Sequence, residues 1–234
     1  MSNPLSVVII TKNEEDFIEE AIKSAQFAKE VVVVDSFSVD KTCEIAKKLG
    51  ARVIQQEWLG FGAQKNLAVS LASNEWVFVL DSDERITKGL KSEIIETLKN
   101  PSFDGYQIAR LNSFFGKNIK SCGLYPDYSI RLFSRLKGKF ENVPVHESVW
   151  VNGKVSKLKN HMIHIAYDNV EEFIEKQKRY ASLSNKKKSL VRALFSPMWT
   201  FIKLYFFKFG FLDGQHGFLI SKIYAMYTFW KYYK

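Results

Sequence analysis

Residues 78–87 read FVLDSDERIT and carry a hydrophobic run directly into three carboxylates. The run begins at Trp76, is short and apolar, and contains residue types that favour a buried strand. Like charges crowded at the end of such a strand are costly unless a positive group lies between them. Asp81, Asp83 and Glu84 therefore indicate a strand that ends at a site for a divalent cation.

The first hundred residues alternate short apolar runs with segments of helical spacing. This alternation is typical of βαβ units, in which helices bury both faces of a parallel sheet. Ligands of open sheets bind beyond the carboxyl ends of the strands, and polar residues follow three of the four runs. The pattern predicts an α/β fold with its site at that edge. We predict strands at 6–10, 31–34, 51–54 and 76–80, and helices at 17–25, 43–49 and 61–71.

The alternation of strands and helices weakens after residue 100. Strands are predicted at 105–111, 128–133 and 148–155, joined by polar turns that contain glycine. One long charged helix is predicted at 169–190, and the chain is aromatic and basic from Pro197 onward. We expect the strands of this half to cap the site at the edge of the first sheet.

The spacing of Asp81 and Asp83 lets both carboxylates converge on one ion in the turn that follows the strand. Ligation by oxygen alone favours Mg²⁺ or Mn²⁺, which bind one or two carboxylates together with substrate phosphates. A phosphorylated ligand is therefore implied. The alternative for residues 81–83 is a solvated acidic turn or a helix N-cap.

The positive charge of the chain lies entirely in its C-terminal third. Residues 151–234 carry 15 Lys and Arg against 5 Asp and Glu, a net +10, whereas the first 150 residues carry 19 against 20, a net −1. Such asymmetry indicates a polyanionic partner, either nucleic acid or an anionic membrane, unless the basic residues form only a solvated face. Because these residues are mixed with large apolar side chains and no nucleic-acid-binding motif is recognised, no nucleic-acid partner is expected.

Two further classes of protein are disfavoured by the sequence. Cys43 and Cys122 lie in unrelated contexts, so neither a disulfide framework nor a zinc site is predicted. No GxGxxG motif follows the first predicted strand, as a dinucleotide-dependent oxidoreductase would require. The first residues lack the features of a signal peptide, and a cytoplasmic location is expected.

Four motifs resemble the signature of glycosyltransferase family 2, a family with the GT-A fold, in their order and spacing. These motifs are SVVIITKNEE at 6–15, VVVVDSFSVDKT at 31–42, GFGAQKNLAV at 60–69 and FVLDSDE at 78–84. Three later segments resemble the bacterial branch that adds β-linked glucose to the inner core of lipopolysaccharide or lipooligosaccharide. They are YPDYSIRLF at 125–133, VPVHESV at 143–149 and FGFLDGQHGF at 209–218.

The resemblance implies a nucleotide pocket behind the first strands. Thr11, Asn13 and Glu14 would line this pocket, and Asp35 would accept the ring N–H of uracil. Lys65 would approach the diphosphate. The alternatives are an Asx-turn or a helix cap for Asp35, and a solvent-facing helical lysine for Lys65.

The same resemblance implies a metal site and a role for the metal ion in the reaction. Asp83 would be the direct metal ligand, and Asp81 would support the ribose or the ion. His146 is a candidate further ligand, although a single histidine is often a structural, hydrogen-bonded residue. Mg²⁺ or Mn²⁺ would offset the charge that develops on the leaving nucleoside diphosphate.

Family 2 enzymes invert the anomeric centre by a single displacement, so one general base must deprotonate the acceptor hydroxyl. The chain lacks the adjacent Glu-Asp pair that is common in the family after the aspartate motif. We favour Asp127 as the base because it precedes Arg131 as the family's base precedes its arginine, and Glu147 is the competitor. Arg131 would contact phosphate, or would form a structural salt bridge.

The resemblance implies transfer of a sugar, glucose first, from a UDP-sugar to a lipid-linked saccharide of the inner core. A polyprenyl-phosphate acceptor is the alternative. We predict a catalytic domain at 1–165, in which 1–100 binds the nucleotide sugar and 101–165 the acceptor, and a helical extension at 166–234.

The extension has the composition of a membrane-associated segment. Lys203, Lys208 and Asp213 interrupt its apolar residues, so it is not predicted to span a bilayer. It is predicted to form an amphipathic helix at the inner face of the cytoplasmic membrane, or a helical hairpin with an aromatic core that packs on the catalytic domain.

Overall fold

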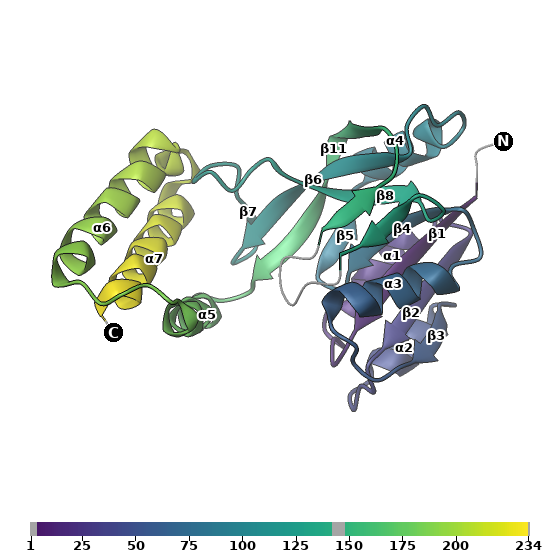
Figure 1. Ribbon diagram of the computed structural model, residues 1–234, viewed down its shortest axis with the longest axis horizontal. Helices are drawn as coiled ribbons and strands as arrows, with labels where there is room; N and C mark the ends of the chain where they lie inside the picture. The colour runs from purple at the N-terminus through teal and green to yellow at the C-terminus, as the bar shows by residue number, and fades with distance from the viewer. Residues whose placement is uncertain (1–3, 142–147, 234) are drawn as a thin grey trace. The chain divides into compact units, whose positions relative to one another are not determined.

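The computed structural model describes residues 4–141 and 148–233, and the chain divides into two compact units (Figure 1). Unit 1 comprises residues 1–110 and 128–164, and unit 2 comprises residues 111–127 and 165–234. Two long strands, β6 (Gly105–Phe114) and β11 (Val155–Tyr167), begin in unit 1 and end in unit 2.

The remaining elements up to β10 alternate as predicted in the first hundred residues and are mostly strands afterwards. They are β1 (Leu5–Thr11), α1 (Ile18–Ala25), β2 (Glu30–Asp35), α2 (Thr42–Lys48), β3 (Arg52–Gln55), α3 (Phe61–Leu71), β4 (Trp76–Asp81), β5 (Glu84–Ile86), α4 (Lys88–Thr97), β7 (Lys117–Asn118), β8 (Asp127–Ser134), β9 (Gly138–Phe140) and β10 (Val149–Val151).

The main sheet follows the order β3-β2-β1-β4-β8-β6-β11-β5, and β7 pairs with β6. The first four strands are parallel, and β8 pairs antiparallel with β4. In this register Thr11 lies beside Asp35, and Ile10 lies beside Asp81. The carboxyl ends of β1, β2 and β4 therefore meet at one edge, which confirms the α/β prediction.

The strands of the parallel half are continuously apolar because they are buried on both faces. Val7 and Ile9 pack in one cluster with side chains of α1 and α4, whereas Val8 packs in a second cluster with Ala68 and Val69 of α3. Alternate residues of β1 thus enter opposite layers, as the period of two in a strand requires.

Two sequence predictions are corrected by the structure. The helix predicted at 169–190 is interrupted: α5 (Val170–Leu183) ends early, and Ser189 caps the start of the next helix by accepting a hydrogen bond from the Arg192 amide at 3.4 Å. Ser184, Asn185 and Ser189 lie between the two helices, and such side chains compete for backbone hydrogen bonds and favour helix ends over helix interiors. The strand predicted at 148–155 stops at Val151, and β11 was not predicted because polar residues interrupt its apolar pattern.

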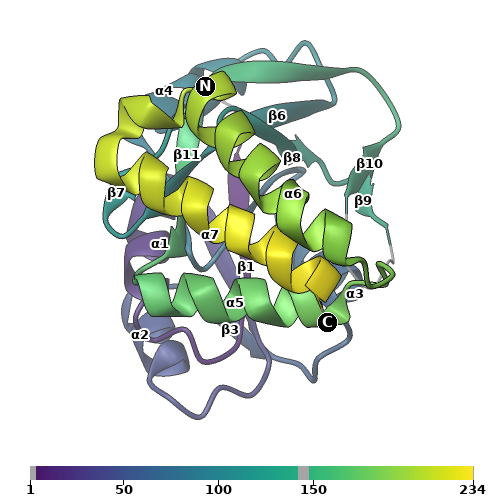
Figure 2. The same cartoon turned by 90° about the vertical axis from the view of Figure 1, so that its left-hand side faces the viewer.

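Unit 2 is built on a helical hairpin. Its helices α6 (Leu190–Ile202) and α7 (Gly214–Tyr233) lie side by side (Figure 2). They are joined by a π-helical turn, η1 (Lys203–Phe207), and a 3₁₀ turn, η2 (Gly210–Asp213). The core of the unit contains Phe114, Tyr167, Phe173, Ile220 and Ile223, with the rings of Tyr167 and Phe173 4.4 Å apart.

Gly217 allows α7 to approach η2 closely. A Cβ atom at this position would lie 1.8 Å from the carbonyl oxygen of Gly210 and 2.7 Å from its carbonyl carbon. Since both atoms belong to the backbone, we expect Gly217→Ala to destabilise unit 2 by about 3 kcal/mol. Hydrogen exchange of the α7 amides measures this loss, with exposed Gln215→Ala in the same helix as the control. Unchanged exchange in Gly217→Ala would contradict the packing.

Candidate functional site

The loops after β1 and β2 are tied together at the sheet edge. The Asn13 amide donates to Ser38 Oγ at 2.8 Å, and the Val39 amide donates to Asn13 Oδ1 at 2.9 Å. The Glu14 amide donates to Thr42 Oγ1 at 2.8 Å. These hydrogen bonds hold the loop that contains the predicted pocket residues Asn13 and Glu14 against the loop that follows β2.

Asp35 is fully buried at the end of β2, and its carboxylate binds Ser38, three residues further along the chain. Its Oδ2 accepts a hydrogen bond from the Ser38 amide at 2.9 Å, and its Oδ1 accepts another from Ser38 Oγ. Burial, together with the neighbouring Asp35 carboxylate, raises the pKa of the Cys43 thiol to about 11. Cys43 is thus a protonated neighbour of this acid at neutral pH.

Thr11 and Glu14 bring polar groups of different kinds to the edge. Thr11 Oγ1 is buried and has no hydrogen-bond partner among the described residues. Glu14 is half-buried, and burial, aided by the charge of Asp83, raises the pKa of its carboxyl group. Buried polar atoms normally find partners, so Thr11 Oγ1 is an unoccupied acceptor or donor at the predicted nucleotide pocket.

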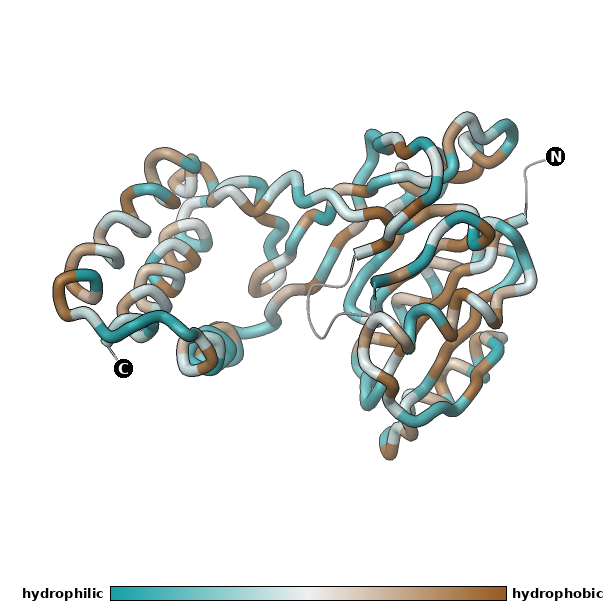
Figure 3. Tube along the Cα trace, viewed as in Figure 1, coloured by the Kyte–Doolittle hydropathy of each residue, from teal (hydrophilic) through white to brown (hydrophobic). Residues whose placement is uncertain are grey.

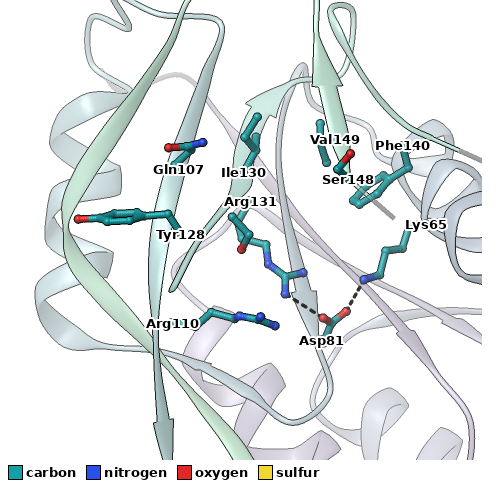
Figure 4. A pocket seen from close by; sticks show the side chains of 11 residues that line it. Lys65, Asp81, Gln107, Arg110, Tyr128, Ile130, Arg131, Phe140, Ser148 and Val149 are labelled. Carbon is teal, nitrogen blue, oxygen red and sulfur yellow. Dashed lines mark hydrogen bonds and ion pairs between the residues drawn. The ribbon is translucent and has the colours of Figure 1, made fainter. Parts of the chain in front are cut away.

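Asp81 lies between two buried cations. Lys65 Nζ is 2.9 Å from Asp81 Oδ1, and an Arg131 terminal nitrogen is 2.9 Å from Asp81 Oδ2 (Figure 4). Lys65 and Arg131 are each only 5% exposed, which excludes the interpretation of Lys65 as a solvent-facing residue. Although burial alone would raise it, the charges of Arg131 and Lys65 hold the pKa of the Asp81 carboxyl well below its usual range.

The buried Glu84 contacts both Arg131 and the backbone of Asp81. Its Oε1 is 2.5 Å from Arg131, and its Oε2 accepts a hydrogen bond from the Asp81 amide at 3.0 Å. Burial raises the pKa of the Glu84 carboxyl, although Arg131 acts against this effect. The structural salt bridge considered for Arg131 is therefore present. It links Asp81 and Glu84, two of the three acids in the DSDE stretch, residues 81–84.

Asp83 has a different environment from Asp81. Its side chain is 37% exposed, and its Oδ2 is 3.3 Å from His164 Nε2. His164 was not predicted as a site residue, because it lies on β11, which was itself not predicted. It pairs in register with Glu84 of β5, so only recognition of that antiparallel pair would have placed it beside Asp83.

A cavity of about 530 Å³ opens in front of Asp81 and its two cationic partners (Figure 4). Its charged lining consists of Lys65, Asp81, Arg110 and Arg131. Two buried polar atoms in the lining, Ser129 Oγ and Arg131 Nε, have no hydrogen-bond partner within the described chain. Glu84 lies 2.5 Å from Arg131 and 4.0 Å from Arg110, so three cations face two carboxylates, and the remaining positive charge suits an anionic ligand.

Comparison with known proteins identifies the family. A model of glycosyl transferase family 2 matches residues 6–146, more than half of the chain. The chain belongs to this family. An uncharacterized glycosyltransferase of Rickettsia typhi is 34% identical over 96% of this chain and 84% of its own length. The lipopolysaccharide core biosynthesis glycosyltransferase LpsC of Rhizobium meliloti is 29% identical over 97% of this chain and 89% of its own length.

The fold of this family 2 glycosyltransferase is shared with a solved structure. TarS of S. aureus, crystallised in complex with UDP, aligns with a TM-score of 0.53 at 19% identity, covering 90% of this chain and 75% of the TarS chain. The predicted GT-A fold is thereby confirmed.

The acids of the DSDE stretch differ in their fitness for a metal ion. Both oxygens of Asp81 are already paired with a cation. Among the ion pairs of the described residues, the half-exposed Asp83 contacts only the His164 imidazole. No group of three or more potential metal ligands occurs in residues 4–141 and 148–233. Asp83 is therefore the acid of residues 81–84 that could hold a hard divalent cation, whose other ligands would be water and phosphate oxygens. Such an ion would offset negative charge on the phosphates.

The structure describes only one of the two candidate bases. Asp127 is half-buried at the first position of β8, and strand geometry puts it on the same face as Ser129 and Arg131. Glu147 and the candidate ligand His146 lie outside the described residues.

Proposed function

We propose that this family 2 glycosyltransferase transfers a sugar, glucose first, from a UDP-sugar to the inner core of lipopolysaccharide or lipooligosaccharide, with inversion. The observation that carries the proposal is the cavity lined by Asp81 and by the cations Lys65, Arg110 and Arg131. A nucleoside diphosphate matches it, because phosphate oxygens can pair with Lys65 and Arg131 as the Asp81 carboxylate does. The acceptor class is supported by the name of the relative LpsC.

The donor is held by residues of the parallel half of the sheet in this proposal. Asp35 at the end of β2 accepts the ring N–H of uracil, and Thr11 Oγ1 gains the partner that it lacks among the described residues. Lys65 and Arg131 bind the diphosphate, and Asp83 holds Mg²⁺ or Mn²⁺ against it. The presence of UDP in the TarS crystal makes UDP-sugars the first donors to test.

The transfer step needs one base in line with the departing diphosphate. Asp127 takes the proton of the acceptor hydroxyl as its oxygen bonds to the anomeric carbon. The bond from that carbon to UDP breaks, and its electron pair leaves with the phosphate oxygen. Lys65 and Arg131 stabilise the negative charge that accumulates there, since they are already buried beside Asp81 and need little reorganisation.

We expect Asp127→Asn to lower kcat by roughly 10²–10⁴-fold, because a missing general base costs about that much, with little change in the KM of the donor. Steady-state transfer assays measure both constants. Exposed Asp168→Asn is the control for loss of an aspartate, and Glu147→Gln tests the competing base. Full activity of Asp127→Asn combined with an inactive Glu147→Gln would assign the base to Glu147.

The catalytic domain and the C-terminal extension have separate functions in this proposal. Residues 1–165 form the catalytic domain, in which 1–100 binds the nucleotide sugar and 101–165 receives the acceptor. Residues 166–234 hold the enzyme at the inner face of the cytoplasmic membrane, where a lipid-linked acceptor is available. In the described part of the chain, no helix is long and apolar enough to cross a bilayer.

The direct test is transfer by the purified protein with a panel of UDP-, GDP- and CMP-sugars, with Mg²⁺, Mn²⁺ or EDTA. Deacylated inner-core oligosaccharide and polyprenyl phosphate are the two acceptors. We expect metal-dependent consumption of one UDP-sugar with the core oligosaccharide only. Transfer to polyprenyl phosphate alone would replace the acceptor, and absence of turnover with every donor would overturn the proposed function.

A further inference from the structure

Exposed apolar side chains are concentrated in one part of unit 2. Twelve of the 26 large apolar side chains that are exposed in the described residues fall between 190 and 218. On α6 they are Leu190, Val191, Leu194, Phe195, Met198 and Trp199, which are 57–69% exposed. Brown segments recur along α6 in Figure 3, between paler and teal ones.

The α6 side chains form one continuous stripe. They occupy two neighbouring rows, at 190, 194 and 198 and at 191, 195 and 199, which lie on the same side of a helix. Ala193 lies on the other side and is buried where α6 packs against α7. The stripe is therefore not the core of the hairpin, and the predicted aromatic core lies elsewhere, around Phe173 and Ile220.

The stripe continues into the turns that join the two helices. Phe206, Phe207, Phe209 and Leu212 of these turns are 54–71% exposed. The rings of Trp199 on α6 and Phe207 in η1 are 6.0 Å apart, so the two surfaces are contiguous. We call the surface formed by the α6 stripe and these turn residues the hairpin face.

Basic residues accompany the hairpin face almost without acids. Residues 184–234 contain nine Lys and Arg and a single acid, Asp213. Lys186, Lys187, Lys188 and Arg192 are exposed at the start of α6. Asp213 accepts hydrogen bonds from the Ser121 amide at 3.0 Å and from Ser121 Oγ at 2.6 Å, so it serves the packing of unit 2.

The combination of exposed apolar side chains and basic residues indicates which kind of partner binds the hairpin face. A second copy of the chain docked on the same surface would bring two sets of cations together, and like-charge juxtaposition disfavours such an interface. An anionic bilayer meets both features at once, because apolar side chains enter the boundary between head groups and acyl chains while lysines contact lipid phosphates. Trp199 also suits the interfacial region of a bilayer.

We propose that the hairpin face lies in the surface of an anionic phospholipid bilayer, with the α6 stripe inserted and Lys186, Lys187, Lys188 and Arg192 at the phosphates. The inference deepens the peripheral membrane location in the proposed function by naming the surface and the lipid class. The membrane inference is tested by binding to vesicles, which does not require sugar transfer. The inference and the proposed function can therefore fail separately.

Flotation of the full chain with vesicles tests the inference. We expect binding to vesicles of phosphatidylcholine mixed with phosphatidylglycerol and little binding to phosphatidylcholine alone. Leu194→Ser with Met198→Ser is expected to weaken partitioning roughly tenfold or more, because two large apolar side chains leave the acyl boundary. The matched control is Val39→Ser with Leu136→Ser, which removes two exposed apolar side chains from unit 1.

A separate variant tests the contribution of the lysine charges to membrane binding. Replacing Lys186, Lys187 and Lys188 with Gln is expected to weaken binding to the anionic vesicles by roughly hundredfold at low salt. The control replaces the exposed Lys47, Lys48 and Lys88 with Gln, which removes the same charge from unit 1. Because all the altered side chains are exposed, circular dichroism should show unchanged folding.

Several outcomes would overturn the inference. These are absence of binding to the anionic vesicles, equal losses in the control variants, or a solution dimer that dissociates when Leu194 and Met198 are replaced. The last result would make the hairpin face an interface between copies of the chain. Salt-sensitive binding of oligonucleotides without vesicle binding would assign the basic residues to nucleic acid instead.

Discussion

Replacement of Arg131 with methionine is expected to lower the free energy of unfolding by about 3–5 kcal/mol, the usual cost of breaking a buried ion pair from one side. Arg131 is the charged partner of both Asp81 and Glu84, at 2.9 Å and 2.5 Å. Glu84 is fully buried, so the variant must either keep an unpaired charge in the interior or protonate that group. Urea denaturation followed by tryptophan fluorescence measures the loss.

The double variant Arg131→Met with Glu84→Gln separates charge from packing. It removes the unpaired buried carboxylate, so we expect it to recover part of the stability that Arg131→Met loses. Arg52→Met is the matched control, because Arg52 is 46% exposed in its ion pair with Glu30 and should cost about 1 kcal/mol or less. Equal losses in Arg131→Met and Arg52→Met would show that the network does not stabilise the fold.

Replacement of Asp83 with asparagine is expected to lower kcat/KM by roughly 10²–10³-fold and to leave the fold intact, because it weakens electrostatic stabilisation of the leaving diphosphate. Asp83 is half-exposed and contacts His164, so its charge supports the site more than the core. Transfer assays measure the loss, and the melting temperature should match that of the native protein.

Metal affinity gives an independent measure of the role of Asp83. Titration of Mn²⁺ followed by electron paramagnetic resonance, with UDP present, should show weaker binding in Asp83→Asn. Glu96→Gln removes an exposed carboxylate of α4 and serves as the control for charge. Native Mn²⁺ affinity in Asp83→Asn would exclude this residue as the ligand, whatever the activity of the variant.

The parallel half of the sheet could be predicted because its determinants are local. The apolar runs at 6–10, 31–34 and 76–80 each form a strand, and α3 has the predicted limits, Phe61–Leu71. The polar ends of these strands also identified the edge at which Thr11, Asp35 and Asp81 meet. In contrast, β11 mixes lysine, asparagine and histidine with apolar residues, since its exposure varies along its length, and no simple period marks it.

The environment of each acid depends on strand neighbours that the chain brings together from a distance. Asp81 pairs with Arg131 although 50 residues separate them, because β8 lies beside β4 in the sheet. His164 reaches Asp83 only through the pairing of β11 with β5. The sequence therefore predicted a cluster of acids, but not that Asp81 would be neutralised by two cations while Asp83 stayed half-exposed.

The C-terminal third shows the same division between local and tertiary information. Its composition alone established a basic, aromatic segment with almost no acids and with charges that interrupt any span. Only the tertiary structure decided which aromatic side chains are buried, with Phe173 in the core of unit 2 and Phe195 and Trp199 exposed on α6. The physical reason is that helical periodicity defines the faces of a helix, whereas the partner packed against one face determines which of them meets solvent.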